Sequence, residues 1–196
     1  MFSTPHFARR GAALALLASL SLTACDSGEP DGGGAGEQEL IRQVTLTLAP
    51  DDGGAALTIT ADFDAAGTNP TYSPARLDLA PGTTYDGTIR LRDPFNNVDV
   101  TAEIEDEAEE HLIRYAFQPA SAGTVAATDA ESDYTDDDEN GGDFAVGLAF
   151  RAAVAAGASG DGSLTAVLYH FDDAPKTSST ATSDEIDVEV AFPVRF

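Results

Sequence analysis

Apolar and polar residues alternate along several segments of this chain, with the two-residue period of half-buried β-strands. At the C-terminus every even position of residues 186–196 is apolar, and the same alternation occupies residues 57–63 and 144–154. Because successive side chains of a strand point to opposite faces of a sheet, each segment predicts a strand with one buried face. These segments predict a fold built from β-sheets.

Turn-forming residues divide the rest of the sequence into further short strands. Gly, Pro, Asn and Asp separate the apolar segments, as in antiparallel sheets with tight connections. Residues 101–110 are the exception, because they are rich in helix formers and have Asp99 or Thr101 as an N-cap. We therefore predict an all-β domain over residues 39–196, an antiparallel β-sandwich of about seven or eight strands with immunoglobulin-like or jelly-roll-like topology and one short helix. The additional strands are expected at residues 44–48, 76–79, 84–92, 111–118 and 164–171.

The first 24 residues have the features of a secretory signal peptide. Arg9 and Arg10 precede an apolar run over residues 11–22 that is too short to remain as a membrane-spanning helix. We therefore expect residues 1–24 to be removed and the mature chain to be exported.

The end of this segment carries a more specific motif. Leu22, Thr23, Ala24 and Cys25 resemble the lipobox of bacterial lipoproteins. The resemblance implies that the mature chain begins at Cys25, with a diacylglyceryl group on its sulfur and usually a further acyl group on its amine. The alternative is an ordinary cysteine after a signal peptide. Cys25 is the only cysteine, so a lipid on its sulfur leaves no thiol for disulfides or zinc.

Residues 25–38 are expected to form a flexible tether between the lipid and the domain. They contain no apolar residue larger than alanine after Cys25 and are rich in glycine. Asp26 resembles the residue that retains some lipoproteins in the inner membrane, but this sorting code differs among bacteria. We expect a lipid-anchored protein of the cell envelope and favour the outer membrane or cell surface over the inner membrane.

The charge of the chain excludes several classes of partner. Its formal net charge is −24 at pH 7, and it becomes −26 once Arg9 and Arg10 are removed. Such a charge repels nucleic acid and anionic lipid head groups, so the lipid alone would hold the protein at the membrane. Lys176 is the only lysine, and the combination of acid excess with scarce lysine resembles proteins from saline habitats. The acidity therefore has an explanation that involves no specific activity.

One acidic segment resembles the first half of a calcium-binding loop. Asp136, Asp138 and Asn140 occupy alternate positions, and the carbonyl of Gly142 would supply a further ligand. Position 12 of such a loop would be Gly147 instead of glutamate, which excludes an EF-hand. A calcium site of another type would need a distant carboxylate, such as Asp129 or Asp133. The alternative is a solvated link between two strands, and no cofactor other than this calcium is expected.

Two histidines of the mature chain form a second candidate site. His111 begins one predicted strand and His170 lies near the end of another. If these strands are neighbours, the pair could bind zinc or another divalent ion together with Glu110 or Asp172. The alternative is that each histidine is a polar residue at a strand end, satisfied by a backbone or carboxylate partner.

The order of segments resembles a set of small bacterial lipoproteins with a lipobox, a low-complexity tether and one β-rich domain. The resembling segments are residues 44–48, 83–85, 109–111, 136–143, 164–170, 175–176 and 187–190. This family has no known activity, so the resemblance implies location and fold only.

No catalytic residues are identified, because GxSxG, Walker and HExxH motifs are absent and paired carboxylates carry no information among 34 acids. We expect a non-enzymatic binding or interaction module whose partner is an unknown envelope protein or small ligand. The alternatives are a small-ligand- or calcium-binding lipoprotein of an uptake system and a hydrolase with an unrecognised site. Nothing in the sequence fixes the oligomeric state.

Overall fold

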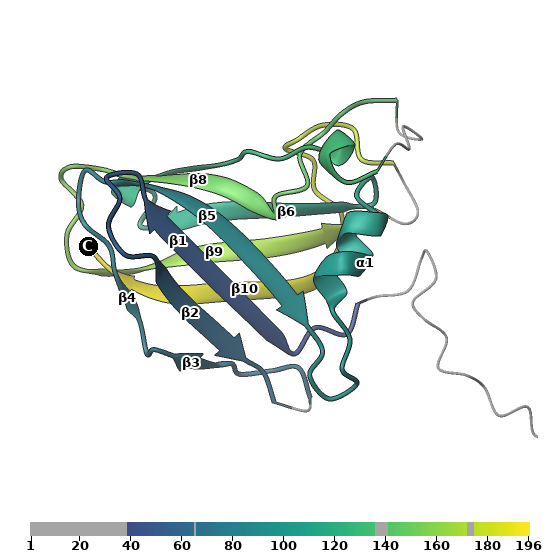
Figure 1. Ribbon diagram of the computed structural model, residues 1–196, viewed down its shortest axis with the longest axis horizontal. Helices are drawn as coiled ribbons and strands as arrows, with labels where there is room; N and C mark the ends of the chain where they lie inside the picture. The colour runs from purple at the N-terminus through teal and green to yellow at the C-terminus, as the bar shows by residue number, and fades with distance from the viewer. Residues whose placement is uncertain (1–38, 65, 136–140, 172–174) are drawn as a thin grey trace, which may run out of the picture. The chain divides into compact units, whose positions relative to one another are not determined.

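The computed structural model describes residues 39–64, 66–135, 141–171 and 175–196, all of which belong to one compact unit, Gly32–Phe196 (Figure 1). The described strands form two sheets. The first contains β1 (Gln43–Pro50), β2 (Leu57–Asp62), β3 (Thr71–Ser73), β5 (Thr84–Arg92), β7 (Gly123–Ala127) and β8 (Ala149–Val154), in the order β3-β2-β1-β5-β8-β7. The second contains β4 (Leu77–Asp78), β6 (His111–Gln118), β9 (Asp161–His170) and β10 (Glu185–Arg195), in the order β4-β10-β9-β6.

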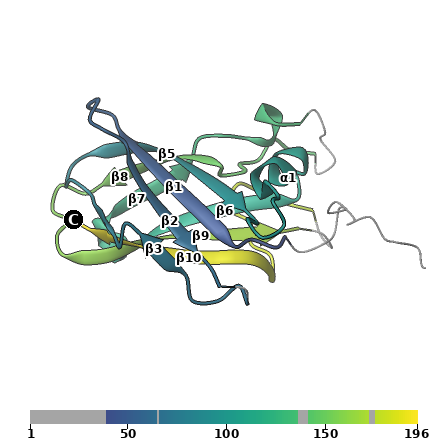
Figure 2. The ribbon, with the colours of Figure 1, turned by 60° about the horizontal axis from the view of Figure 1, so that its bottom comes forward.

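The two sheets pack face to face around a common apolar core. Figure 2 shows β1 and β2 crossing in front of β9 and β10. Leu46 and Ile59 of the first sheet and Leu164 and Phe192 of the second are fully buried in one cluster. Burying each such side chain contributes about 1.5–3 kcal/mol, before the entropy of ordering the chain is subtracted. All strand pairs except β4 with β10 are antiparallel. The all-β sandwich predicted from the sequence is confirmed.

The helical elements are short, and the main helix is shorter than predicted. Helix α1 (Val100–Asp106) ends four residues before the expected limit of residue 110, and two 3-10 turns occur at Ala120–Ala122 and Glu131–Asp133. Asp99 occupies the N-cap position without a side-chain capping hydrogen bond. Thr101 instead uses its hydroxyl to accept a hydrogen bond from Leu91 N at 2.8 Å and to donate one to Leu91 O. These two hydrogen bonds join helix α1 to β5. The helix covers the end of the sandwich where β9 ends (Figure 1).

Two short strands were missed by the sequence analysis. Strand β3 has three residues, and β7 lies in the segment between β6 and residue 143 that was interpreted as a link. The strand predicted over residues 144–154 begins only at Ala149. Gly147 has a positive φ of 90°, and its N–H donates to a side chain, so the regular ladder starts after it.

A β-bulge changes the pattern of the C-terminal strand. The pairing of β10 with β9 shifts between Ile186 and Val188. A bulge inserts an extra residue and re-aims the neighbouring side chains. Ile186, which the alternation assigned to the buried face, is 39% exposed, and the side chain of Asp187 is 1% exposed. A carboxylate thus enters the interior at a position that the two-residue period assigned to the polar face.

No helix within the described ranges combines the length and apolar character needed to cross a membrane.

Candidate metal centre

Strands β6 and β9 bring the two histidines together. His111 and His170 are directly opposite in the antiparallel register, and their rings stack with centroids 4.6 Å apart and an interplanar angle of 26°. Both residues are buried. The sequence analysis made a joint site conditional on neighbouring strands, and the structure fulfils that condition.

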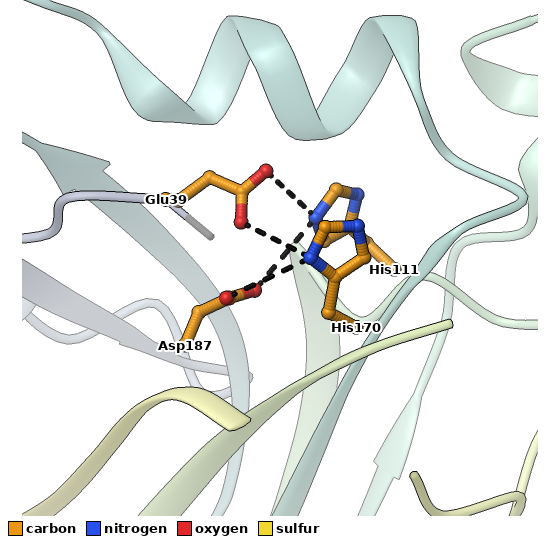
Figure 3. Close-up of side chains that lie close together, drawn as sticks. All are labelled: Glu39, His111, His170 and Asp187. Atoms are coloured by element: carbon orange, nitrogen blue, oxygen red, sulfur yellow. Dashed lines mark ion pairs between the residues drawn. The ribbon is translucent and has the colours of Figure 1, made fainter. Parts of the chain in front are cut away.

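Two carboxylates complete the cluster, and both had been missed. Glu39 approaches from the segment before β1, and Asp187 comes from the bulge of β10 (Figure 3). Each carboxylate faces both imidazoles. His111 Nε2 lies 3.0 Å from Glu39 Oε1 and 3.8 Å from Asp187 Oδ2. His170 Nδ1 lies 3.7 Å from Glu39 Oε2 and 3.8 Å from Asp187 Oδ1.

The four side chains are almost completely removed from solvent. Their exposed fractions are 6% for Glu39, 0% for His111, 3% for His170 and 1% for Asp187. Among the described residues, several of their polar atoms have no partner in hydrogen-bonding geometry: Glu39 Oε2, His111 Nε2 and both carboxylate oxygens of Asp187 within the cluster, and His170 Nε2 on its outer side. Leaving a buried polar group unsatisfied costs about 1–3 kcal/mol, and more for a charged group. A shared cation at the centre would give His111 Nε2 and both carboxylates a partner at once.

The outward-facing nitrogens of the two imidazoles differ in their contacts: that of His111 has a hydrogen-bond partner, whereas that of His170 has only a carboxylate within ion-pair distance. His111 Nδ1 lies 3.0 Å from the backbone oxygen of Glu107, so it donates there and Nε2 is the nitrogen that faces the carboxylates. His170 Nε2 lies 3.7 Å from Glu110 Oε2, on the side away from the cluster centre. Metal-binding histidines commonly have such a backbone or carboxylate partner, which fixes the ring and raises its basicity.

The pKa values of these groups are displaced in opposite directions. Burial alone would raise the pKa of Glu39, but its contacts with His111 and Asp187 and the charges of the two histidines lower that pKa to about 2. Burial, followed by the contact with Glu39 and its charge, raises the pKa of Asp187 to about 8. Burial opposes charge on His111, but Glu39 outweighs burial and raises the pKa of this imidazole. Without metal the cluster therefore retains protons near neutral pH, and a metal ion would displace them.

The donor atoms have a geometry that suits a first-row divalent metal. One donor atom from each residue can be chosen so that all four lie within 4.8 Å of one another. A tetrahedral ion with bonds of about 2.0–2.1 Å requires donors about 3.3–3.4 Å apart. The nitrogen–oxygen distances of 3.0–3.8 Å are of this order, although they involve both oxygens of each carboxylate, so one oxygen of each would have to move towards the ion. Two carboxylates also balance the charge of a divalent ion, which removes most of the cost of burying either alone.

The ligand types exclude calcium and favour zinc-like ions. Calcium takes six to eight oxygen ligands, whereas this cluster presents two imidazoles. Imidazole with carboxylate suits Zn²⁺ and neighbouring transition metals. Four protein ligands also fill a tetrahedral shell, as in structural zinc sites, whereas catalytic sites leave one position for water or substrate.

A second buried polar cluster adjoins the first at His111. Lys176 Nζ is fully buried and lies 2.7 Å from Glu131 Oε1. It also donates to the backbone oxygens of Ala108, His111 and Ala145, at 2.8, 2.8 and 3.1 Å. All these contacts lie within hydrogen-bonding range, so this cluster is a satisfied network.

The predicted calcium loop lies largely outside the described residues. This applies to Asp136, Asp138 and Asn140, whereas Gly142 is described and half-buried. The carboxylates named as additional calcium ligands have other partners. Asp129 accepts hydrogen bonds from Gly147 N, Ala149 N and the Tyr134 hydroxyl, and Asp133 accepts one from Ala130 N.

Some of the remaining predicted residues lie outside the described ranges and others lie within them. Cys25 and its lipobox residues Leu22, Thr23 and Ala24 lie outside the described ranges, as does Asp172. Glu110, the other carboxylate proposed beside the histidines, is placed next to His170, facing the nitrogen that points away from the centre. The two histidines are therefore neighbours, as one of the two alternatives required, and the described carboxylates that face both of them are Glu39 and Asp187.

Comparison with known proteins gave no match. No protein-family model, no curated protein and no solved structure is similar to this chain at a significant level. Function is therefore argued from the geometry of the cluster.

Proposed function

We propose that this chain is a lipid-anchored protein of the cell envelope whose β-sandwich binds one divalent transition-metal ion, with zinc as the best match. The ion would be held by Glu39, His111, His170 and Asp187. The role is that of a binding module and involves no catalysis.

A single observation carries the proposal. Two imidazole nitrogens and two carboxylates converge in a buried position with polar atoms that lack hydrogen-bond partners. Native structures rarely leave such atoms unsatisfied, and an ion is one of the few explanations for a group of them. The backbone hydrogen bond behind His111 supports the same interpretation, as does the carboxylate of Glu110, which lies within ion-pair distance of the outer nitrogen of His170.

The closed shell supports binding over hydrolysis. A metal-dependent hydrolase needs an open coordination position at which water is activated. Here the exposed fraction of each of the four side chains is at most 6%. Access for a substrate would require the ligand shell itself to open.

Calorimetric titration of zinc into the metal-stripped full chain tests the proposal. High salt and excess Mg²⁺ would suppress weak binding by the many surface acids. We expect one saturable zinc ion per chain, lost in His111→Ala and in His170→Ala and retained in Glu189→Gln, which removes an exposed acid of β10. Absence of saturable binding in the unaltered chain, or equal binding in the histidine variants, would contradict the proposal.

The lipid anchor rests on the lipobox-like residues 22–25 and has its own test. We expect Cys25→Ala to move the protein from the membrane fraction to the soluble fraction of the envelope, because one cysteine carries the whole anchor. Unchanged membrane association of that variant would contradict the lipoprotein assignment and leave the metal site untouched.

A further inference from the structure

The four side chains of the cluster are held by the fold in two different ways. His111 and His170 lie opposite each other in the ladder between β6 and β9, and His170 is also paired with Glu185 of β10. Asp187 follows two residues later, within the bulge of the same strand. Three ligands are therefore fixed to adjacent strands of one sheet.

Additional bonds secure the histidine end of this sheet. Phe171 N donates to Glu110 O, and Lys176 Nζ donates to His111 O, both at 2.8 Å. The Nδ1 contact with Glu107 O fixes the orientation of the His111 ring. Displacing either imidazole would thus break the strand ladder or a buried network.

Glu39 is attached far more weakly. It precedes β1, and the nearest backbone hydrogen bond from its segment to another strand is Arg42 N to Arg92 O, three residues along the chain. Among the described residues the backbone oxygen of Glu39 accepts from the nearby Ile41 N, and the backbone of Glu39 also contacts the Asp187 carboxylate, which is itself part of the cluster. Ile41 is buried, but Leu40 is 51% exposed. Apolar packing therefore does not fix the position of Glu39 and Leu40, which form a short arm ahead of Ile41. Figure 3 shows Glu39 and Asp187 facing the two histidines from the same side, with Glu39 on a segment of chain of its own.

We propose that Glu39 is a detachable fourth ligand, and that movement of Glu39 and Leu40, ahead of the buried Ile41, is the route by which the metal enters and leaves. This inference rests on the metal-binding function proposed above. With the arm away, His111, His170 and Asp187 form a three-ligand site with one open position, the arrangement from which zinc exchanges ligands readily. With the arm in place, the ion is enclosed.

Metal binding should in turn affect the attachment of the arm. Because binding couplings are reciprocal, an ion that is held more tightly with the arm docked must dock the arm more firmly. Glu39 is the residue at which the predicted tether, residues 25–38, joins the domain. Metal occupancy therefore controls how firmly the first residues of the domain are attached to β6, β9 and β10.

Zinc release and hydrogen exchange together test this inference on the full chain. Transfer of zinc to an excess of chelator is timed for the unaltered protein, for Glu39→Ala and for Glu189→Ala, in which an exposed acid is removed as the control. We expect Glu39→Ala to bind one zinc ion and to release it at least about tenfold faster. The control should release zinc at the rate of the unaltered protein.

Hydrogen exchange needs no variant and covers the case in which Glu39→Ala is unstable. We expect zinc to slow amide exchange in residues 39–42 at least about tenfold, with a much smaller effect in β6 and β9, whose ladder exists without metal. Equal release rates in Glu39→Ala and the control, complete loss of binding in Glu39→Ala, or uniform protection of all three segments would overturn the inference. Failure of the unaltered chain to bind zinc would instead overturn the proposed function.

Discussion

Two buried polar clusters meet at His111, and they differ in how well their atoms are satisfied. In the cluster of Lys176 and Glu131, the ammonium has a carboxylate and three backbone oxygens within 3.1 Å. In the cluster of Glu39, His111, His170 and Asp187, five polar atoms have no partner in hydrogen-bonding geometry among the described residues. Burial is nearly complete in both, so the difference lies in the chemistry of the groups and their contacts.

The difference separates a structural role from a binding role. A fully satisfied buried network fixes a unique packing, whereas a partly satisfied one is costly unless a ligand completes it. Burial lowers the pKa of Lys176, and Glu131 opposes that shift by stabilising the charged ammonium. The cluster of Lys176 is complete within the protein, while the histidine cluster requires protons or a cation.

Replacing Lys176 should give the largest change in folding stability. Lys176→Met leaves Glu131 as a buried charge without its cation, which costs about 3–5 kcal/mol in the free energy of unfolding. Chemical denaturation measures this change, and Arg195→Met, which removes an exposed cation, serves as the control. The contrast drawn between the two clusters fails if Lys176→Met is as stable as the control.

Zinc should stabilise the unaltered chain by a smaller amount. At a free zinc concentration about 100 times Kd, binding to the folded state alone adds about 2.7 kcal/mol, which raises Tm by about 5–10 °C for a domain of this size. Thermal denaturation with zinc and with chelator measures the shift. Calcium at the same concentration should give no comparable shift, because the cluster offers imidazole nitrogen in place of oxygen ligands. An equal effect of calcium would remove the distinction between the two clusters.

Loss of a partner behind a histidine should weaken zinc binding moderately. Glu110 lies beside the outward-facing nitrogen of His170, and replacing such a partner commonly reduces metal affinity about 10–100-fold. We expect Glu110→Gln to show this loss in a competition titration with a zinc chelator, while Glu109→Gln, at the adjacent position, binds zinc nearly as tightly as the unaltered chain. Equal affinities of the two variants would show that Glu110 does not support His170.

Removal of one inner carboxylate should separate binding from stability. Asp187 has its pKa raised to about 8, first by burial, so its ionisation opposes folding. The stability that the protonated form contributes is present below its unfolded pKa of about 4 and is lost as pH rises through about 8. We therefore expect the metal-free protein to lose stability over this pH range and Asp187→Asn to lose less. At pH 8 the free energy of unfolding of Asp187→Asn should exceed that of the unaltered chain by on the order of 1 kcal/mol. Zinc should not raise the Tm of this variant.

Denaturation of metal-free protein at several pH values measures this effect. Asp184→Asn, a variant outside the cluster, should follow the pH dependence of the unaltered chain. A steeper loss of stability with rising pH in Asp187→Asn would contradict the role assigned to this carboxylate.

The sequence predicted the sandwich because the two-residue period reports burial directly. It also left open a joint site of His111 and His170, conditional on neighbouring strands, and β6 and β9 are neighbours. It could not supply the inner carboxylates, for two physical reasons. Glu39 lies outside any periodic segment, and its position depends on how the chain enters β1. Asp187 lies in a bulge, which reverses the side-chain alternation that was used to assign it to the polar face.

The location of the zinc ion tests the central claim most directly. Anomalous scattering at the zinc absorption edge, from crystals of the full chain grown with zinc in high salt, would locate bound ions without reference to affinity. We expect one strong peak among Glu39, His111, His170 and Asp187, at about 2.0–2.2 Å from one donor atom of each residue. The absence of a peak at this position, with any zinc confined to surface carboxylates, would contradict the assignment of the cluster as a metal centre.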